Sequence, residues 1–181
     1  MKFIELPVRG AYRIEIDKHE DDRGFFARIF CADEFRDRGL ATTFVQQSVS
    51  FNARKATLRG LHYQIGPHAE TKIVRCTAGS AFDVIVDLRR ASPSFGRWHA
   101  ETISAGNRAS IYIPAGCAHG FQTLEDNTEL CYDITLAYVP EAGRGIAFDD
   151  PEIGISWPLP DPIVSAADRA RPSFAQAEMF A

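Results

Sequence analysis

The sequence lacks the features that mark several large classes of protein. It contains no run of about 18 apolar residues, so we expect no membrane-spanning helix. Lysine and arginine total 20 against 24 aspartates and glutamates, without the basic excess that is typical of nucleic-acid-binding domains. The segment 1–7 lacks the longer apolar core of a signal peptide. We therefore expect a cytoplasmic protein whose partners include neither a membrane nor a nucleic acid.

Cysteine is also scarce, and its spacing suggests no site. Cys31, Cys76, Cys117 and Cys131 are scattered and include no C-x-x-C pair. A chain of 181 residues buries roughly 70% of its unfolded surface and needs no disulfide to hold it together. We expect free and mostly buried thiols in a reducing compartment.

Short segments of alternating apolar and polar residues are abundant, and glycine, proline and asparagine separate them. Such alternation is typical of half-buried strands, which it predicts at 12–16, 44–51, 57–64, 71–76, 81–88, 98–103, 109–113, 119–124 and 129–138. We expect a helix at 32–38 that ends at Gly39, and a partly helical tail at 165–181. No repeat or linker divides the chain, so 1–181 is predicted to form one all-β domain, a sandwich or closed barrel.

Arg59 and His62 stand close together in the predicted strand 57–64. Strict alternation would place their side chains on opposite faces of the sheet. Gly60 lies between them and could mark a bulge that re-aims one of the two side chains. The residues alone fit a surface arginine beside a core histidine as well as they fit an active site.

A second segment, 113–121, carries the pattern P-x-G-x-x-H. Pro114 and Gly116 are typical of a tight turn, which would deliver His119 into the next strand. The pattern resembles the second motif of the cupins, small double-stranded β-helix barrels, and Gly79 matches the end of their first motif.

Cupins usually bind a metal through histidines and a glutamate, and this chain departs from that ligand set. Gln64 and Lys72 stand at positions where the resemblance would place ligands. An ammonium group repels a divalent ion and cannot ligate it. Although His62, His119 and the nearby His68 or Glu70 could still assemble a site, we expect no metal and no other cofactor.

Tyr132 lies in the predicted strand 129–138, on the face that it shares with Leu130 and Ile134. This face would be the barrel interior. Tyr132 is then either a core tyrosine with a hydrogen-bond partner or a proton donor that faces His62 across a pocket.

These residue types together favour metal-free proton chemistry. Histidine is a natural general base near neutral pH, tyrosine can protonate a carbanion, and lysine can stabilise an oxyanion. A base and an acid on opposite faces of a carbon invert its configuration, provided that an adjacent carbonyl acidifies that carbon. The basic residues that would suit an anionic substrate such as a diphosphate are Arg23, Arg59 and Arg75.

From about 14 to 158, the sequence resembles the dTDP-4-dehydrorhamnose 3,5-epimerases, a family of cupin-fold sugar-nucleotide epimerases, and the resemblance resumes at 162–168. The matching motifs are DRGFF at 22–26, FVQ at 44–46, LRGLHYQ at 58–64, KIVR at 72–75, FDV at 82–84, SPSFG at 92–96, IPAG at 113–116, HGF at 119–121 and DDP at 149–151. The resemblance implies a cupin-like jelly-roll barrel with short peripheral helices. It also implies an isomerase that inverts C3 and C5 of a nucleotide-linked 4-keto-6-deoxy sugar.

The resemblance implies a catalytic role for four residues. His62 would remove the proton beside the C4 ketone, and Asp168 would orient His62 and stabilise its charged form. Tyr132 would return a proton at C5 from the opposite face, while solvent could serve at C3. Lys72 would steady the enolate oxygen.

The same resemblance implies how the substrate is bound. Arg23, Arg59 and His119 would hold the diphosphate and the nearby sugar. The residues expected closer to the nucleoside are Phe26, Gln46, Ser48 and Tyr138. Family members are homodimers that exchange N-terminal strands, so we expect a homodimer in which the partner chain supplies some binding residues.

Four positions depart from the family pattern around the nucleotide. They are Arg28 in place of a glutamate, Ser48 in place of an asparagine, Ala137 in place of an aromatic residue, and Gly143 in place of a glutamate. A reversed charge changes which substrate groups the site can bind. A mono-epimerase, or an epimerase of a CDP- or GDP-linked sugar, is therefore an alternative. A metal-dependent cupin oxygenase and a binding module without catalysis are disfavoured.

Overall fold

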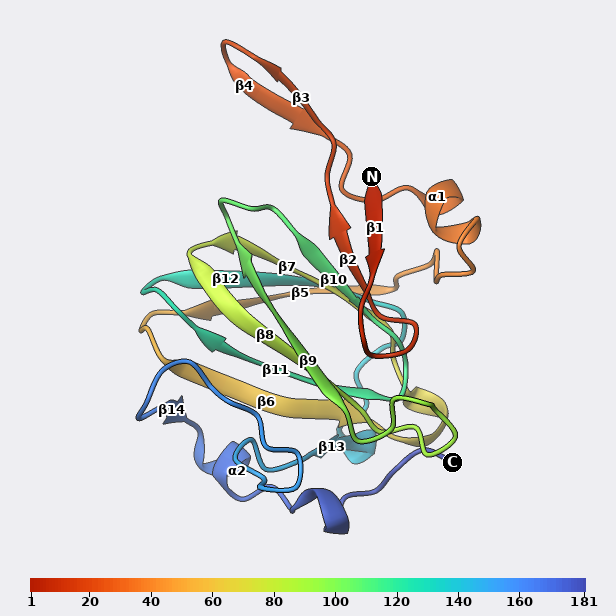
Figure 1. Ribbon diagram of the computed structural model, residues 1–181, viewed down its shortest axis with the longest axis vertical. Coiled ribbons are helices and arrows are strands. Elements are labelled where there is room, and N and C mark those ends of the chain that lie inside the picture. The colour runs from red at the N-terminus through yellow and green to blue at the C-terminus, as the bar shows by residue number, and fades with distance from the viewer.

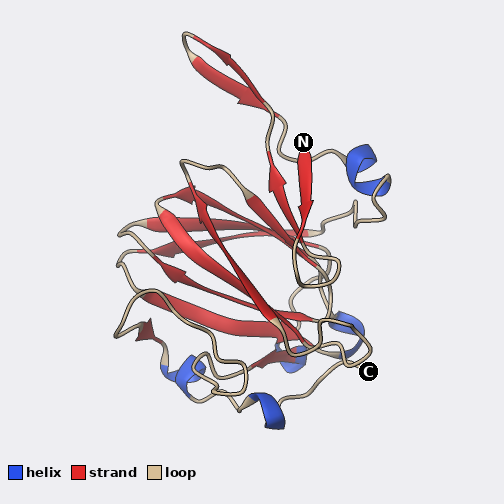
Figure 2. Cartoon of the chain, in the orientation of Figure 1, coloured by secondary structure: helices blue, strands red, loops and turns tan.

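The computed structural model describes residues 1–181, and strands dominate it (Figure 2). Two sheets face one another (Figure 1). The first contains, in spatial order, β1 (Lys2–Glu5), β2 (Tyr12–Glu15), β10 (Ser110–Ile113), β7 (Lys72–Ala78), β12 (Thr128–Ile134) and β5 (Gln46–Asn52). The second contains β13 (Gly143–Gly145), β6 (Thr57–Gln64), β11 (Cys117–Thr123), β8 (Ser80–Asp87) and β9 (Trp98–Ser104), with β14 (Ile163–Val164) parallel to β6. The predicted all-β fold is confirmed.

Helical structure is limited to short peripheral segments. These are α1 (Ala32–Arg36), α2 (Ala166–Arg169) and single 3-10 turns at Gly66–His68, Pro140–Ala142 and Phe174–Gln176. Helix α1 ends two residues earlier than predicted, and Gly39 follows in the left-handed conformation with φ of +69°. None of the helices has the length and apolar character needed to cross a bilayer.

The largest core cluster fills the space between the two sheets. Val74, Ile111 and Leu130 from the first sheet meet Ile85 and Phe121 from the second, and all five side chains are buried. Alternate residues of each strand point into this space, as expected for two packed sheets. A second cluster covers the other face of the second sheet, where Phe174 of the C-terminal tail packs near Leu61 and Val84. The tail is therefore bound to the strands that carry the site described below.

The predicted strands are correct in place but not in every boundary. Strand β6 has the predicted bounds, whereas β12 ends at Ile134 rather than at 138. In the ladder, Ile134 pairs with Gln46 and Lys72, the first residues of β5 and β7. The prediction of 129–138 was wrong at its end because the backbone pairing closes one residue later, where the Thr135 N–H donates to the Thr71 carbonyl at 3.1 Å, and the chain then leaves the sheet.

One hairpin projects away from the two sheets (Figure 1). It consists of β3 (Lys18–Asp21) and β4 (Gly24–Ala27), which pair only with each other. All but one of its strand residues are exposed. Alternation did not predict the hairpin because the sequence of β3, KHED, has no apolar face.

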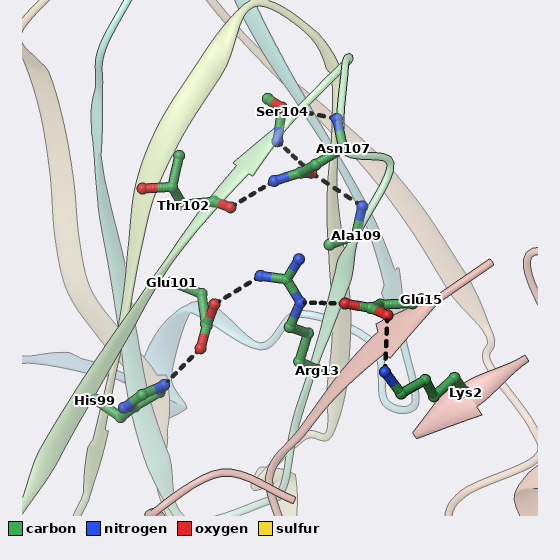
Figure 3. A network of polar contacts seen from close by, with 9 residues as sticks. All are labelled: Lys2, Arg13, Glu15, His99, Glu101, Thr102, Ser104, Asn107 and Ala109. Atoms are coloured by element: carbon green, nitrogen blue, oxygen red, sulfur yellow. Dashed lines mark hydrogen bonds and ion pairs between the residues drawn. The ribbon is translucent and has the colours of Figure 1, made fainter. Parts of the chain in front are cut away.

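A polar network ties strand β2 of the first sheet to β9 of the second (Figure 3). Arg13 donates to Glu15 at 3.1 Å and to Glu101 at 2.8 Å, and His99 lies 2.9 Å from Glu101. Burial would raise the pKa of Glu101, but the hydrogen bonds from His99 and Arg13 outweigh it and lower that pKa. These residues do not line the pocket described below, and they support the contact between the two sheets.

All four cysteines are free thiols. Cys76 and Cys117 are buried, and the other two are half-buried. Burial raises the pKa of Cys76 to about 11 and that of Cys117 to about 12. The two buried thiols therefore stay protonated at neutral pH and behave as small apolar side chains.

Candidate active site

A pocket of about 430 Å³ opens between the facing sheets, and we call it the central pocket. Strands β5, β7 and β12 form one wall, while β6, β11 and β13 form the other. Its lining includes Gln46, Ser48, Ser50, Arg59, His62, Gln64, Glu70, Lys72, His119, Phe121, Tyr132, Tyr138, Gly143, Arg144 and Arg171. Most of the residues predicted to form the site therefore face one cavity.

His62 and Asp168 are in direct contact although 106 residues separate them in the sequence. His62 Nε2 lies 2.5 Å from Asp168 Oδ1, and the other ring nitrogen, Nδ1, makes no hydrogen bond within the chain. Ser165 caps α2 and accepts a hydrogen bond from the Asp168 backbone at 3.1 Å. Burial would raise the pKa of Asp168, but the hydrogen bonds from His62, Gly60 and Ser165 outweigh it and lower that pKa. Asp168 therefore stays charged and holds the His62 ring.

An irregularity in β6 brings Arg59 and His62 into the same pocket. The pairing of β6 with β11 shifts register between His119 and Phe121, opposite Gly60. Gly60 has φ of +133°, and a Cβ added there would lie 2.5 Å from Gly120 Cα. A side chain at this position would force the two strands apart, which explains the need for glycine. The bulge predicted from Gly60 is confirmed.

Tyr132 faces His62 from the opposite wall of the pocket. Its ring packs against the core and lies edge-on to His119, with 5.9 Å between ring centroids. Its hydroxyl makes no hydrogen bond within the chain, and desolvation raises the pKa of Tyr132 well above its ordinary value. The phenol therefore stays protonated at neutral pH and is free to donate its proton to a ligand.

His119 and Lys72 are each paired with a carboxylate. His119 Nε2 lies 2.7 Å from Asp83 Oδ2, and both residues are buried. Lys72 Nζ lies 2.9 Å from Glu70 Oε1, and the other oxygen of Glu70 is buried without a hydrogen-bond partner. The Lys72 ammonium thus lies at the pocket wall, where it can stabilise negative charge on an oxygen.

Arg75 does not reach the central pocket, so its predicted role beside an anionic substrate was wrong. It lies on the outer face of the first sheet, where it donates to Asp133 at 3.0 Å. Lys72 and Arg75 are three residues apart in one strand, which puts their side chains on opposite faces. The parity of the strand was sufficient to exclude Arg75.

Arg23 and Phe26 lie on the β3–β4 hairpin, outside the central pocket of their own chain. The Arg23 side chain is 89% exposed and pairs with Asp21, while Phe26 is 77% exposed. Of the departures from the family pattern, Ser48 and Gly143 line the pocket. The third, Arg28, lies near the hairpin and 3.6 Å from Glu34, and the fourth, Ala137, is exposed.

Several polar residues that line the pocket were not predicted from the sequence as substrate-binding residues. The missed residues are Ser50, Gln64, Glu70, Arg144 and Arg171. Ser50 has the same parity as Gln46 and Ser48 in β5, so alternation could have identified it. Glu70, Arg144 and Arg171 lie beside or beyond the main strands, where alternation carries no information.

Comparison with known proteins identifies the family. Residues 5–176 match the family model described as dTDP-4-dehydrorhamnose 3,5-epimerase. The chain is 44% identical over 182 residues to the Pseudomonas aeruginosa dTDP-4-dehydrorhamnose 3,5-epimerase, covering 99% of each chain. It superposes on the crystal structure of the Elizabethkingia anophelis enzyme with a TM-score of 0.94 and 36% identity over 97% of each chain.

Two solved complexes extend this comparison. The Legionella pneumophila enzyme in complex with dTDP-4-keto-L-rhamnose matches with a TM-score of 0.90 and 36% identity, covering 97% of this chain and 93% of that one. A 3'-monoepimerase from Streptomyces bikiniensis, in complex with dTDP-quinovose, matches with a TM-score of 0.88 and 32% identity, covering 94% and 86%. The predicted cupin-like barrel is confirmed by these neighbours. The chain is an isomerase that belongs to the dTDP-4-dehydrorhamnose 3,5-epimerase family.

Proposed function

We propose that the central pocket inverts C3 and C5 of dTDP-4-dehydro-6-deoxy-D-glucose and so produces dTDP-4-dehydro-L-rhamnose. The placement of His62 and Tyr132 on opposite walls of one pocket is the observation that carries this proposal. A sugar ring between them would present one face to a base and the other to an acid. Removal of a proton from one face and its return to the other inverts the carbon.

The first step is removal of a proton next to the C4 ketone. In the neutral imidazole, Nε2–H donates to the Asp168 carboxylate, which leaves the lone pair of Nδ1 as the base. The proton moves to Nδ1, and the C–H electron pair forms an enolate with its charge on O4. The negative charge of Asp168 stabilises the imidazolium that results. The Lys72 ammonium stabilises the enolate oxygen.

The second step returns a proton from the other face. At C5 the Tyr132 hydroxyl is the donor, and solvent supplies the proton at C3. Collapse of the enolate restores the ketone, and the resulting tyrosinate regains a proton from solvent. The His62 imidazolium releases its proton to solvent and can then act at the second carbon. Because the pKa of Tyr132 is raised by burial, the neutral phenol is its resting form.

Substrate binding by this proposal uses two chains. Arg59 and His119 hold the diphosphate and the adjacent sugar, and Gln46, Ser48 and Tyr138 lie along the path to the nucleoside. Arg23 and Phe26 act in the pocket of a second copy in a homodimer. Their exposure on a projecting hairpin supports this assignment. A single domain over 1–181 and a cytoplasmic location are part of the same proposal.

A mono-epimerase is the second candidate. The similarity to the 3'-monoepimerase and the altered residues Ser48 and Gly143 in the pocket favour it. A small change in the sugar pose decides which proton faces His62. A CDP- or GDP-linked 4-keto sugar is a further alternative, because the same departures lie where the nucleotide is expected.

Deuterium incorporation tests the proposal. The protein is incubated with dTDP-4-keto-6-deoxyglucose in heavy water, and the C3 and C5 positions are followed by NMR. Exchange and inversion at both carbons are expected. Exchange at one carbon would replace the proposal with the mono-epimerase. No exchange by the folded protein would contradict the dTDP-linked substrate, and the CDP- and GDP-linked 4-keto sugars would then be tested.

A further inference from the structure

Arg171 lines the central pocket from the C-terminal tail, directly after helix α2. Its backbone N–H donates to the Asp168 carbonyl at 3.4 Å, and the next carbonyl, of Pro172, accepts from Ala147 at 2.8 Å. The side chain lies over Gly145 of β13. A Cβ added at Gly145 would lie 2.7 Å from Arg171 Nε and 2.8 Å from its Cδ. The missing side chain at Gly145 therefore makes the space that Arg171 occupies.

The guanidinium of Arg171 makes no hydrogen bond within the chain. Its Nε is buried without a partner, 3.9 Å from Asp168 Oδ1. That carboxylate oxygen already accepts from His62 at 2.5 Å. The other two arginines of the pocket differ, because Arg59 donates to Asn52 at 2.8 Å and Arg144 donates to Glu178 at 2.8 Å. Arg171 is thus the pocket arginine whose donors are free for a ligand.

We propose that Arg171 binds an anionic oxygen of the substrate's diphosphate. The inference rests on the proposed function and extends its binding site to the tail. A guanidinium presents a planar fork of N–H groups that matches two phosphate oxygens at once. In β13, Gly145 pairs with His62 in register, so Arg171 lies on the β13 side of the base. Arg59 lies three residues before His62 in β6, so the pocket lining places two guanidinium groups near the base.

A different role would follow from the short distance between Arg171 and Asp168. In that role, the positive charge of Arg171 would act on the His62–Asp168 pair and would make no contact with the substrate. That role predicts a changed pH dependence of proton removal without a change in nucleotide affinity. Ligand binding predicts a lower nucleotide affinity with an unchanged pH dependence, because Arg171 would then contact the phosphates and not the base.

Calorimetric titration of the full-length protein with thymidine, dTMP and dTDP separates these roles. Substitution Arg171→Ala is expected to weaken dTDP binding by roughly ten- to a hundredfold, the range for a lost hydrogen bond to a charged group. Thymidine affinity should stay at its wild-type value, so the loss appears only when phosphates are present. Arg171→Lys should retain part of the affinity, because lysine keeps the charge but not the fork.

Arg169→Ala is the matched control. Arg169 belongs to the same tail, is exposed, and donates to the Pro162 carbonyl at 3.4 Å rather than lining the pocket. It should bind dTDP like the wild type. Arg171→Gln retains much of the side-chain volume over Gly145 and guards against a folding defect, which the midpoint of thermal unfolding reports.

Three results would overturn the inference. The first is wild-type dTDP affinity in Arg171→Ala and Arg171→Gln. The second is an equal loss of thymidine and dTDP affinity, which indicates a damaged pocket. The third is an altered pH profile of deuterium exchange with unchanged dTDP affinity. If the wild type neither binds dTDP nor exchanges deuterium, the proposed function itself is wrong. If the wild type binds dTDP and exchanges deuterium, any of the three results in the Arg171 variants contradicts only the role of Arg171 and leaves the proposed function standing.

Discussion

The central pocket and the β3–β4 hairpin hold their functional side chains in different ways. His119 and Tyr132 belong to strands with a neighbour on each side, β6 and β8 for β11, and β7 and β5 for β12. Arg23 and Phe26 belong to a two-stranded hairpin that projects from the body and pairs with neither sheet. An isolated hairpin is marginally stable in water. The pocket residues are therefore held by paired strands within one chain, whereas the hairpin residues have no such support from their own chain.

The same Asp–Arg pair occurs in the body of the fold and in the hairpin, with different surroundings. Asp87, at the end of β8, is fully buried and accepts hydrogen bonds from Arg89, Ser92 and Ser94. In the hairpin, Asp21 and Arg23 form the equivalent pair in solvent. Buried pairs depend on both partners, while exposed pairs contribute little to stability. The following predictions test this contrast.

His62→Ala should have the largest effect. Loss of a general base slows reactions by roughly 10²–10⁴-fold, so exchange at both C3 and C5 should fall to the background rate. Nucleotide affinity should change little. His99→Ala is the control, because His99 lies in the outer polar network and outside the pocket. Substantial exchange in His62→Ala would show that another group is the base.

Tyr132→Phe should slow product formation by about 10²-fold while sparing proton removal. The change removes only the hydroxyl, so the ring still packs against His119. The measurement compares the rate of deuterium exchange with the rate of C5 inversion in the same sample. If both rates fall equally, Tyr132 is not a dedicated acid.

Asp87→Asn should destabilise the fold by about 3 kcal/mol, because the change leaves a guanidinium facing a neutral amide in the interior. Burial would raise the pKa of Asp87, but the hydrogen bonds from Arg89, Ser92 and Ser94 outweigh it and lower that pKa. The charged pair therefore contributes its stability above about pH 3.9, and this contribution is lost as the pH falls through the lowered pKa.

Urea titrations at neutral and acidic pH measure the free energy of unfolding for this comparison. Asp21→Asn in the hairpin is the matched control and should unfold like the wild type at both pH values. The difference in the free energy of unfolding between Asp87→Asn and the wild type should become smaller at acidic pH. Equal stabilities of the two variants at neutral pH would show that the buried pair of Asp87 contributes no more to stability than the exposed pair of Asp21.

Gly60→Ala should cost roughly 2 kcal/mol, because the added Cβ meets backbone atoms of β11 that cannot rotate away. Deuterium exchange should also slow down, because separation of β6 from β11 would move Arg59 and His62 relative to Tyr132. Gly66→Ala is the control. Gly66 also has positive φ but nothing within 4 Å of its added Cβ, so it should lose only about 1 kcal/mol of stability and keep its activity.

These residues also show what could be predicted from sequence. Alternation located β6 and put Tyr132 on an inner face because strand geometry repeats every two residues. It could not reveal Asp168, whose contact with His62 depends on how the tail packs around the second sheet. The resemblance to the family supplied that pairing.

The hairpin and the pocket residues outside the predicted strands were out of reach for a different reason. Exposed strands such as β3 bury no face and leave no apolar pattern. Arg171 enters the pocket only because Gly145 leaves space, and that space depends on two segments meeting. Tertiary contacts of this kind have no local signature.

Arg23→Ala should have the smallest effect when it is studied alone. Mixed with His62→Ala, it tests whether the hairpin acts in the partner's pocket. Because the side chain is exposed, the fold should keep its stability, and dTDP affinity should fall roughly tenfold if Arg23 touches a phosphate. If the hairpin serves the partner's pocket, a heterodimer of Arg23→Ala with His62→Ala regains one complete site. That site takes His62 from one chain and Arg23 from the other. Equal mixing, with subunit exchange confirmed by mass spectrometry and substrate kept well below saturation so that the weaker binding of Arg23→Ala lowers its own rate, should then restore about a quarter of the wild-type activity, since half of the dimers are mixed and each has one working site. No recovery would show that Arg23 acts in its own chain, and the proposed role of the hairpin in a partner's pocket would be wrong.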